Sequence, residues 1–253
     1  MNYRLTVKLV PVYEGMGSDM GQIYLVRHGQ ASFGAANYDQ LSALGFEQAR
    51  LLGQWYANGR QVFQRVVTGG MARHRQTADA CLAELPKPQL AETEWITDPD
   101  FAEFDHHEVL LRHCPEFGDA VAFKRLLASH VDPPRALEHL FRAAMQRWMS
   151  GWHDDEYRET WPQFRRRCIA ALERLDTESS KQATIVFTSG GVISTLMQHL
   201  LGLQDYQVME MNWTLANCAV TKLLHRPGQF TLSYLNNYAH LEWLGQPGAV
   251  TYR

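Results

Sequence analysis

The chain has 253 residues, of which 45% are hydrophobic and 20% are charged, and its formal net charge is −3. These values are ordinary for a soluble globular protein, and the length suits one α/β domain with an insertion and a substantial core. Because no sustained basic stripe is present, nucleic acid is excluded as an expected partner. No apolar run reaches the length of a membrane span, so no membrane association is expected.

We assign residues 1–20 to an N-terminal extension and residues 21–253 to the main domain. Residues 3–9 alternate apolar and polar side chains, which is a strand pattern that Pro11 then breaks. The extension is compatible with an added edge strand, a loose tail or an upstream start. No signal peptide is visible. The four scattered cysteines contain no Cys-x-x-Cys pair, which indicates reduced thiols in a cytoplasmic protein and no zinc site.

The most informative segment is residues 24–32, an apolar strand that runs directly into Arg27, His28 and Gly29. The carboxyl end of a strand is where open α/β folds keep their active sites. Gly29 lacks a Cβ and allows close approach to the imidazole. A histidine beside a guanidinium that grips two phosphoryl oxygens indicates a nucleophile for phosphoryl transfer.

A second strand is expected within residues 61–68, followed by a helix that starts within residues 69–78. Arg73 and Thr77 are four residues apart and share one face of that helix, whereas Arg75 points elsewhere. Arg73 is therefore the expected phosphate ligand.

Two further segments carry polar groups suited to the same chemistry. Glu103 lies in Ala-Glu-Phe-Asp and could protonate a leaving group. A third buried strand at residues 183–187 ends in Thr-Ser-Gly-Gly, where Ser189, Gly190 and the start of a helix offer backbone N–H groups to an anion. Residues 105–108 read Asp-His-His-Glu, but consecutive side chains rarely aim at one ion, so no metal is expected.

The remaining elements follow from periodicity and turn residues. Helices are expected over Ala120–His130, Arg135–Trp148 and Trp161–Leu175, with the Pro133-Pro134 pair as a start signal for the second. Strands are expected over Ala216–Leu224 and Phe230–Leu235, joined by the turn at residues 226–228.

With these motifs in order, the chain from about Gln22 to its C-terminus resembles the histidine phosphatase superfamily, the phosphoglycerate-mutase-like group, in its smaller branch. The resemblance implies a three-layer α/β/α sandwich with a mainly parallel sheet. It implies that His28 becomes a phosphohistidine, that Arg27 and Arg73 bind the phosphoryl oxygens, and that Glu103 donates the proton. No cofactor is implied.

The chain departs from the family pattern in three places. Ser189 stands where the family usually has a second histidine. His106 and His107 replace the usual aromatic-glycine pair after the glutamate segment, and we expect His106, or else His107, to replace the missing histidine, the alternative being a surface loop residue. Asn37 is expected to take the phosphate-binding role of an asparagine that the family carries closer to the nucleophile.

Residues of about 109–162 resemble the helical cap insertion that in this family covers the phosphate pocket and sets specificity. We expect its aromatic side chains to form the core of the cap and not a substrate platform; they include Phe117, Phe123, Phe141, Trp148 and Trp152.

The expected activity is therefore that of a phosphomonoester hydrolase, with a small-molecule phosphomonoester or a phosphorylated protein as substrate. Two alternatives stay open. One is a mutase-type phosphotransferase, and the other is a non-catalytic protein that binds a phosphorylated ligand on the same fold.

Overall fold

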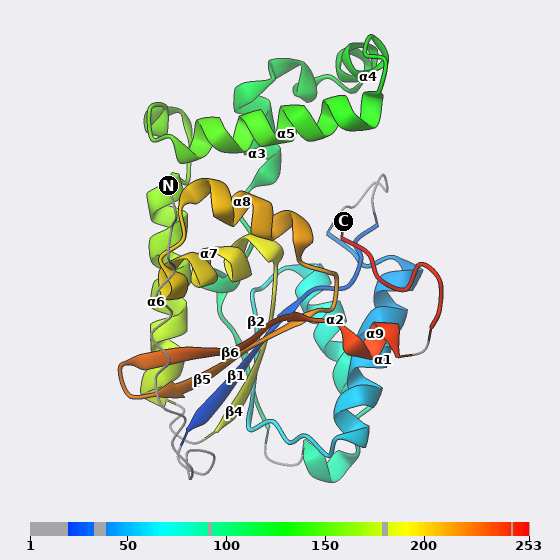
Figure 1. Cartoon of the computed structure of the whole chain (residues 1–253), viewed down its shortest axis with the longest axis vertical. Coiled ribbons are helices and arrows are strands. Elements are labelled where there is room, and N and C mark those ends of the chain that lie inside the picture. Colours follow the sequence, from blue (N-terminus) through cyan, green and yellow to red (C-terminus); the bar gives the residue numbers. More distant parts are fainter. Residues whose placement is uncertain (1–19, 33–38, 91–92, 179–181, 244, 253) are drawn as a thin grey trace, which may run out of the picture.

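The computed structural model describes residues 20–32, 39–90, 93–178, 182–243 and 245–252. Its six strands are β1 (Gly21–Arg27), β2 (Arg65–Thr68), β3 (Glu94–Thr97), β4 (Ala183–Thr188), β5 (Val220–Arg226) and β6 (Gln229–Asn237). The helices of the sheet domain are α1 (Ala43–Asn58), α2 (Ala72–Leu82), α6 (Trp161–Glu178), α7 (Gly190–Leu201), α8 (Asp205–Thr214) and α9 (Ala239–Glu242). Helices α3 (His106–His113), α4 (Ala120–Ala128) and α5 (Pro133–Met149) lie together at one end of the molecule (Figure 1).

The strands form one sheet in the order β3-β2-β4-β1-β5-β6. The pairs β3/β2, β2/β4 and β4/β1 are parallel, whereas β5 and β6 run antiparallel at the other edge. The expected mainly parallel α/β sheet is therefore confirmed.

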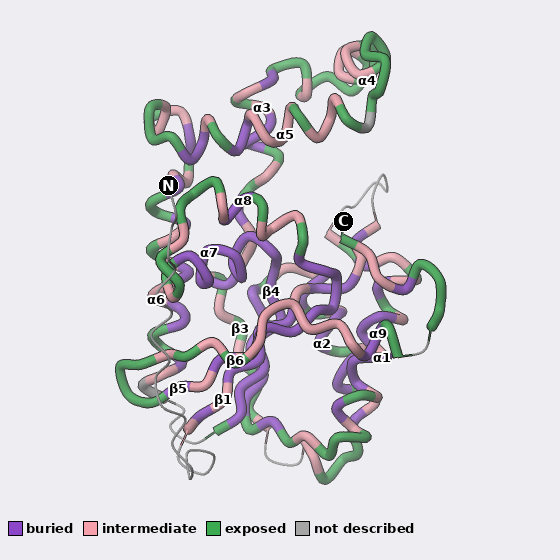
Figure 2. The backbone as a smooth tube through the Cα atoms, in the orientation of Figure 1, coloured by how far each residue is buried: buried purple, intermediate pink, exposed green. Residues whose placement is uncertain are grey.

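Alternating side chains of β1 build the cores on the two faces of this sheet. Ile23 and Leu25 pack with residues of α6 and α7, while Tyr24 and Val26 pack with residues of α1 and α2. Both sets are buried, and in Figure 2 the buried backbone concentrates in the sheet and α7. The result is the expected layering of helix, sheet and helix.

Several expected boundaries need correction. The strand expected over residues 61–68 begins only at Arg65, and β3 was not expected at all. The strand expected from Ala216 begins at Val220, because Cys218 has a φ of +57° that turns the backbone out of extended geometry. Helix α5 begins at Pro133, where the Asp132 carboxylate accepts from the Arg135 N–H at 3.1 Å.

The four cysteines are free and buried, in agreement with the expected reduced thiols. Among the described residues, no helix is both long and apolar enough to cross a membrane. The expectations for residues 1–19, and for Asn37, fall outside the described residues.

Candidate active site

Most of the polar side chains singled out in the sequence meet in one cavity of about 460 Å³. Strands β1, β2 and β4 end at the same edge of the sheet, and the segments that leave them carry the polar groups. The cavity is lined at this end by Arg27, His28, Arg73, Glu103 and His106. Ser189 and Gly190 are not among the described lining residues.

His28 is held as a neutral imidazole with a defined tautomer. Its Nδ1 lies 2.7 Å from the Gly29 carbonyl oxygen. Because a carbonyl can only accept, Nδ1 carries the proton and Nε2 keeps its lone pair. Burial, and then the charges of Arg73 and Arg27, hold the pKa of His28 well below its usual value. The ring is therefore prepared to act as a nucleophile.

The two arginines are fixed by contacts from distant parts of the chain. The Arg27 Nη1 donates to the Leu215 carbonyl and, at 3.1 Å, to the Tyr252 carbonyl. The Arg73 side chain is 3% exposed, and its Nη1 donates to the Asp39 carboxylate at 3.0 Å. Asp39 also accepts from the Ala72 N–H at 2.9 Å, so it both caps α2 and orients Arg73.

The choice between Arg73 and Arg75 agrees with the geometry of α2. Arg75 is exposed, pairs with Asp79 at 2.9 Å, and lies over the ring of Trp95. Thr77 lies on the face of Arg73, donates to the Arg73 carbonyl at 2.7 Å, and accepts from the Gly29 N–H at 3.0 Å. These bonds connect the second motif to the loop that follows His28.

Gly29 is required by a close approach between backbones. A Cβ built on Gly29 would lie 2.4 Å from the Gly45 carbonyl oxygen at the start of α1. The sequence indicated close approach to the imidazole, and the structure adds close packing against this helix.

Glu103 is placed by the N-terminus of α7. Its carboxylate accepts from the Gly191 N–H at 3.1 Å and from the Phe104 N–H at 3.2 Å. Burial raises its pKa, and these two N–H groups together with Arg73 and Arg27 oppose the rise only in part. A Cβ on Gly191 would lie 2.1 Å from the Glu103 Oε1, so any other residue there would displace this carboxylate.

The segment that carries Glu103 is anchored in the cap. The buried ring of Phe104 packs against Trp148 of α5 at 4.9 Å between centroids, and against Phe164 of α6 at 5.5 Å. The acid is thereby attached to the packing between the cap and the sheet domain.

The hydroxyl of Ser189 does not reach the cavity, and the expectation that the Gly190 N–H binds phosphate stays a prediction. Ser189 is fully buried, and its Oγ lies 2.6 Å from the Nε2 of His74, which is also fully buried. The Gly191 N–H is used by Glu103. The helix start therefore holds the acid, and the hydroxyl of Ser189 faces a histidine and not the cavity.

His74 is the residue that sequence reasoning missed. Its ring centroid is 5.8 Å from that of His28, and burial, followed by the charge of Arg73, holds its pKa well below the usual value. Two features of the sequence could have indicated it: His74 directly follows Arg73, and the chain lacks the second histidine expected at position 189. A histidine from α2 thus contacts the serine that stands at the position of the missing one.

His106 and His107 both line the cavity. Burial, and then Arg73, lower the pKa of His106, which favours a neutral imidazole at neutral pH. Its ring therefore lines the cavity without a fixed positive charge. His107 is exposed, and its ring packs against Phe117 at 5.0 Å.

The expectation that the cap aromatics form core holds only in part, because Phe117 and Phe141 pack against the hydrophobic core and also face the cavity. Phe117, Phe123 and Phe141 line the cavity together with Trp213 of α8. Trp148 is indeed core, at 1% exposed, whereas Trp152 is 86% exposed and belongs to neither group. Helical periodicity could not separate a side chain that faces the cap core from one that faces a cavity.

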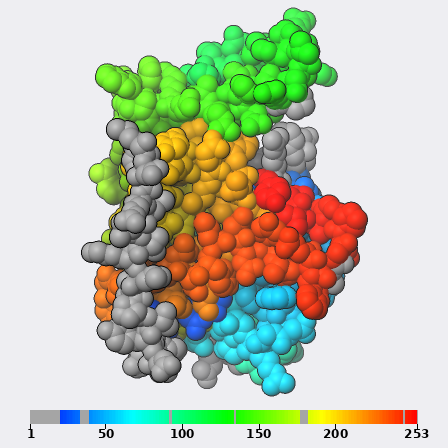
Figure 3. Space-filling view, viewed as in Figure 1, coloured from blue at the N-terminus to red at the C-terminus, as the bar shows by residue number. Residues whose placement is uncertain are grey.

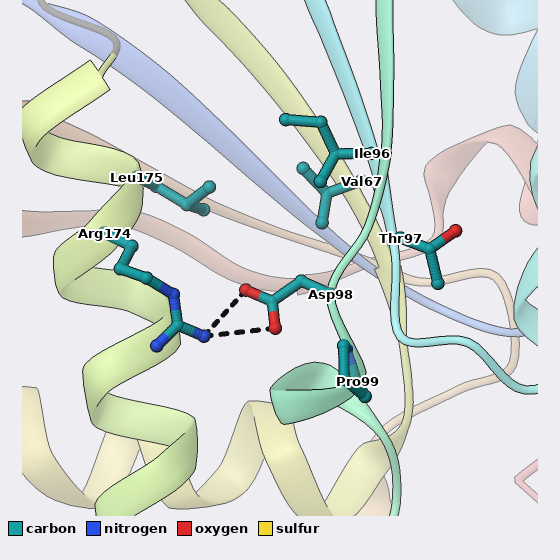
Figure 4. A pocket seen from close by; sticks show the side chains of 7 residues that line it. All are labelled: Val67, Ile96, Thr97, Asp98, Pro99, Arg174 and Leu175. Carbon is teal, nitrogen blue, oxygen red and sulfur yellow. Dashed lines mark hydrogen bonds and ion pairs between the residues drawn. The ribbon is translucent and has the colours of Figure 1, made fainter.

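A second hollow, lined by Val67 and Ile96 among others, lies beside β3 and α6 (Figure 4). The Arg174 guanidinium at its rim donates to the carboxylates of Asp98 at 2.8 Å and Asp100 at 2.7 Å, so these charges pair with one another. Within the described part of the chain, no cluster of three or more His, Cys, Asp or Glu could hold a metal ion. The cavity around His28 is therefore a better candidate for the active site than the hollow beside β3, whose charged residues pair with one another.

Comparison with known proteins shows the family of the chain. The model of the histidine phosphatase superfamily (branch 1) matches residues 23–117 and 132–238. No curated protein matches the chain.

Solved structures share the fold at low sequence identity. A phosphoglycerate mutase from Bacillus anthracis is 18% identical with a TM-score of 0.57, over 88% of this chain and 96% of that one. A mutant phosphoserine phosphatase from Entamoeba histolytica in complex with phosphoserine is 16% identical with a TM-score of 0.59, over 88% and 100%. A complex of phosphoserine phosphatase from the same organism with 3-phosphoglyceric acid is 17% identical with a TM-score of 0.57, over 88% and 100%.

Proposed function

Since the chain belongs to the histidine phosphatase superfamily, we propose that it hydrolyses phosphomonoesters through a phosphohistidine at His28. The observation that carries this proposal is one cavity that combines a neutral imidazole, two guanidiniums and a carboxyl group of raised pKa. These groups match the demands of nucleophilic attack, charge stabilisation and proton donation.

In the first step the lone pair of the His28 Nε2 attacks phosphorus in line with the ester oxygen. The P–N bond forms as the P–O bond breaks, and Glu103, protonated because burial raises its pKa, gives its proton to the departing alcohol. Arg27 and Arg73 hold the equatorial oxygens while negative charge redistributes.

In the second step the Glu103 carboxylate takes a proton from water, which attacks the phosphohistidine. The P–N bond breaks, the electron pair returns to Nε2, and inorganic phosphate leaves. His106 lies in the same cavity and donates a hydrogen bond to a phosphoryl oxygen in either step.

The test uses the purified full chain with a panel of phosphomonoesters, measuring released phosphate and isomerised ester separately. We expect phosphate release in the wild type and its loss in His28→Ala, with a phosphoryl group on the peptide containing His28 after quenching at alkaline pH. Isomerised ester in place of phosphate would favour a mutase. Phosphate release that persists in His28→Ala would refute the role of His28.

A further inference from the structure

We propose, on the basis of the hydrolysis proposed above, that the substrate is a phosphomonoester of an aromatic or similarly apolar alcohol. Phosphorylated hydroxy acids and amino acids, whose carboxylate would have to enter the far end of the cavity, are expected to be poor substrates.

The cavity is chemically divided along its length. The catalytic arginines, His28 and Glu103 lie at the sheet edge, and the far wall is built from the cap and α8. The apolar residues of that wall are Leu110, Phe117, Phe123, Leu137, Phe141 and Trp213, and its polar members are Glu138 and His107, whose ring packs on Phe117. Figure 3 shows α8 directly beneath the cap helices, and α5 contacts α8. The leaving group bound at His28 therefore extends between these two surfaces.

The aromatic wall is preformed. Phe117 and Phe123 meet edge to face, with centroids 4.9 Å apart, and Phe141 and Trp213 meet edge to face at 5.6 Å. These four rings are only half-buried, in contrast to the fully buried Trp148. They keep apolar surface exposed to the cavity that a ligand ring could cover.

The charges of the lining residues also favour an apolar leaving group. Arg27 and Arg73 both act on the pKa of His28, which places their charge at the phosphoryl end. The charged residue of the far wall that the structure describes is Glu138, whose carboxylate pairs with Arg142 at 3.5 Å. A substrate carboxylate would meet phenyl rings there, and the neighbouring guanidinium of Arg142, which lies over Trp213, already pairs with Glu138 and Glu210. Burial of the substrate carboxylate would therefore be costly.

The volume of about 460 Å³ falls within the range of small-molecule sites, about 300–1,000 Å³. A phosphoryl group fills only the catalytic end of such a cavity. The remaining space fits a ring system and not only the short carbon chain of a phosphorylated hydroxy acid.

The first test needs no substitution. Binding of two non-hydrolysable phosphonates to the wild-type protein is measured by calorimetry: a naphthylmethyl phosphonate and 3-phosphonopropionate. We expect the naphthyl compound to bind about ten- to a hundredfold more tightly, the factor that corresponds to burial of one aromatic group. Equal binding, or tighter binding of the carboxylate, would overturn the inference.

The second test compares Phe141→Ala with Trp152→Ala. Both substitutions remove a cap aromatic, but Phe141 lines the cavity and Trp152 is 86% exposed outside it. We expect Phe141→Ala to lower kcat/KM for naphthyl phosphate about tenfold or more and to leave that for 3-phosphoglycerate within about twofold. Trp152→Ala should leave both unchanged, and thermal melts confirm that both variants fold.

The two proposals fail in different ways. Turnover that favours 3-phosphoglycerate or phosphoserine over naphthyl phosphate would overturn the apolar leaving group and keep the phosphatase. Preferential binding of the naphthyl phosphonate without turnover of any ester would overturn hydrolysis and support the ligand class.

Discussion

The contact between His74 and Ser189 predicts that a histidine at position 189 is tolerated only when His74 is replaced by a smaller residue. Ser189→His alone places a ring against the existing ring of His74, since the Ser189 Oγ and the His74 Nε2 are 2.6 Å apart and both residues are fully buried. Overpacking of this kind costs about 1–3 kcal/mol of unfolding free energy.

His74→Ala alone opens a cavity and leaves the Ser189 hydroxyl without its partner, at a cost of about 2–5 kcal/mol. In the double variant the new histidine enters the space that His74 vacated. We therefore expect it to be about 1–3 kcal/mol more stable than the sum of the two single losses.

Urea unfolding of the four proteins measures this coupling directly. The control pairs His74→Ala with Ser194→Ala, because Ser194 lies on the same helix but donates to the Gly190 and Gly191 carbonyls. This control pair should be additive. Additivity within about 0.5 kcal/mol for His74 and Ser189 as well would refute a direct interaction between them.

Further predictions concern the catalytic end of the cavity. Arg73→Lys should lower kcat/KM about a hundred- to a thousandfold, because lysine cannot reproduce the fork, whereas Arg75→Lys should be nearly silent; equal losses would contradict the assignment. Glu103 acts as an acid only below its raised pKa, so the ratio of wild-type to Glu103→Gln kcat/KM should fall towards one as pH rises through that pKa, and a pH-independent ratio would indicate a structural role. The lowered pKa of His28 should keep the wild type active at pH values below 6.5, since only the neutral ring attacks, and loss of kcat/KM already at pH 6.5 would contradict that lowering. His106→Ala should raise KM more than it lowers kcat if the neutral imidazole binds phosphate in substrate and transition state alike, which steady-state kinetics at saturating ester can separate.

The sequence predicted what depends on local pattern. The strand that ends just before His28 and the helix that begins beside Arg73 have strong apolar and turn signals. The position of both residues at the carboxyl edge of the sheet could therefore be predicted. Strand β3 was missed because three of its four residues are exposed, and its pairing with β2 supplies what the local pattern lacks.

Contacts between distant segments could not be predicted in this way. Asp39 orients Arg73 from the segment before α1, 34 residues earlier in the chain. The carbonyls of Leu215 and Tyr252 hold Arg27 from positions 188 and 225 residues later. The pairing of His74 with Ser189 crosses 115 positions. Each of these contacts depends on the order of strands in the sheet, which a single sequence does not encode in its periodicity.

The packing of Phe104 between Trp148 and Phe164 has a consequence for how specificity can change in this fold. Glu103 is the immediate neighbour of a ring that packs against Trp148 of the cap and Phe164 of α6, and the first cap helix begins only three residues after Glu103, at His106. We expect a substitution that reshapes the cap for a new alcohol to shift also the Glu103 carboxyl group, the proposed proton donor to that alcohol. Substrate range and reaction rate are therefore expected to change together in this chain. Variants with a new specificity should first show altered rates, until further substitutions restore the position of the Glu103 carboxyl group.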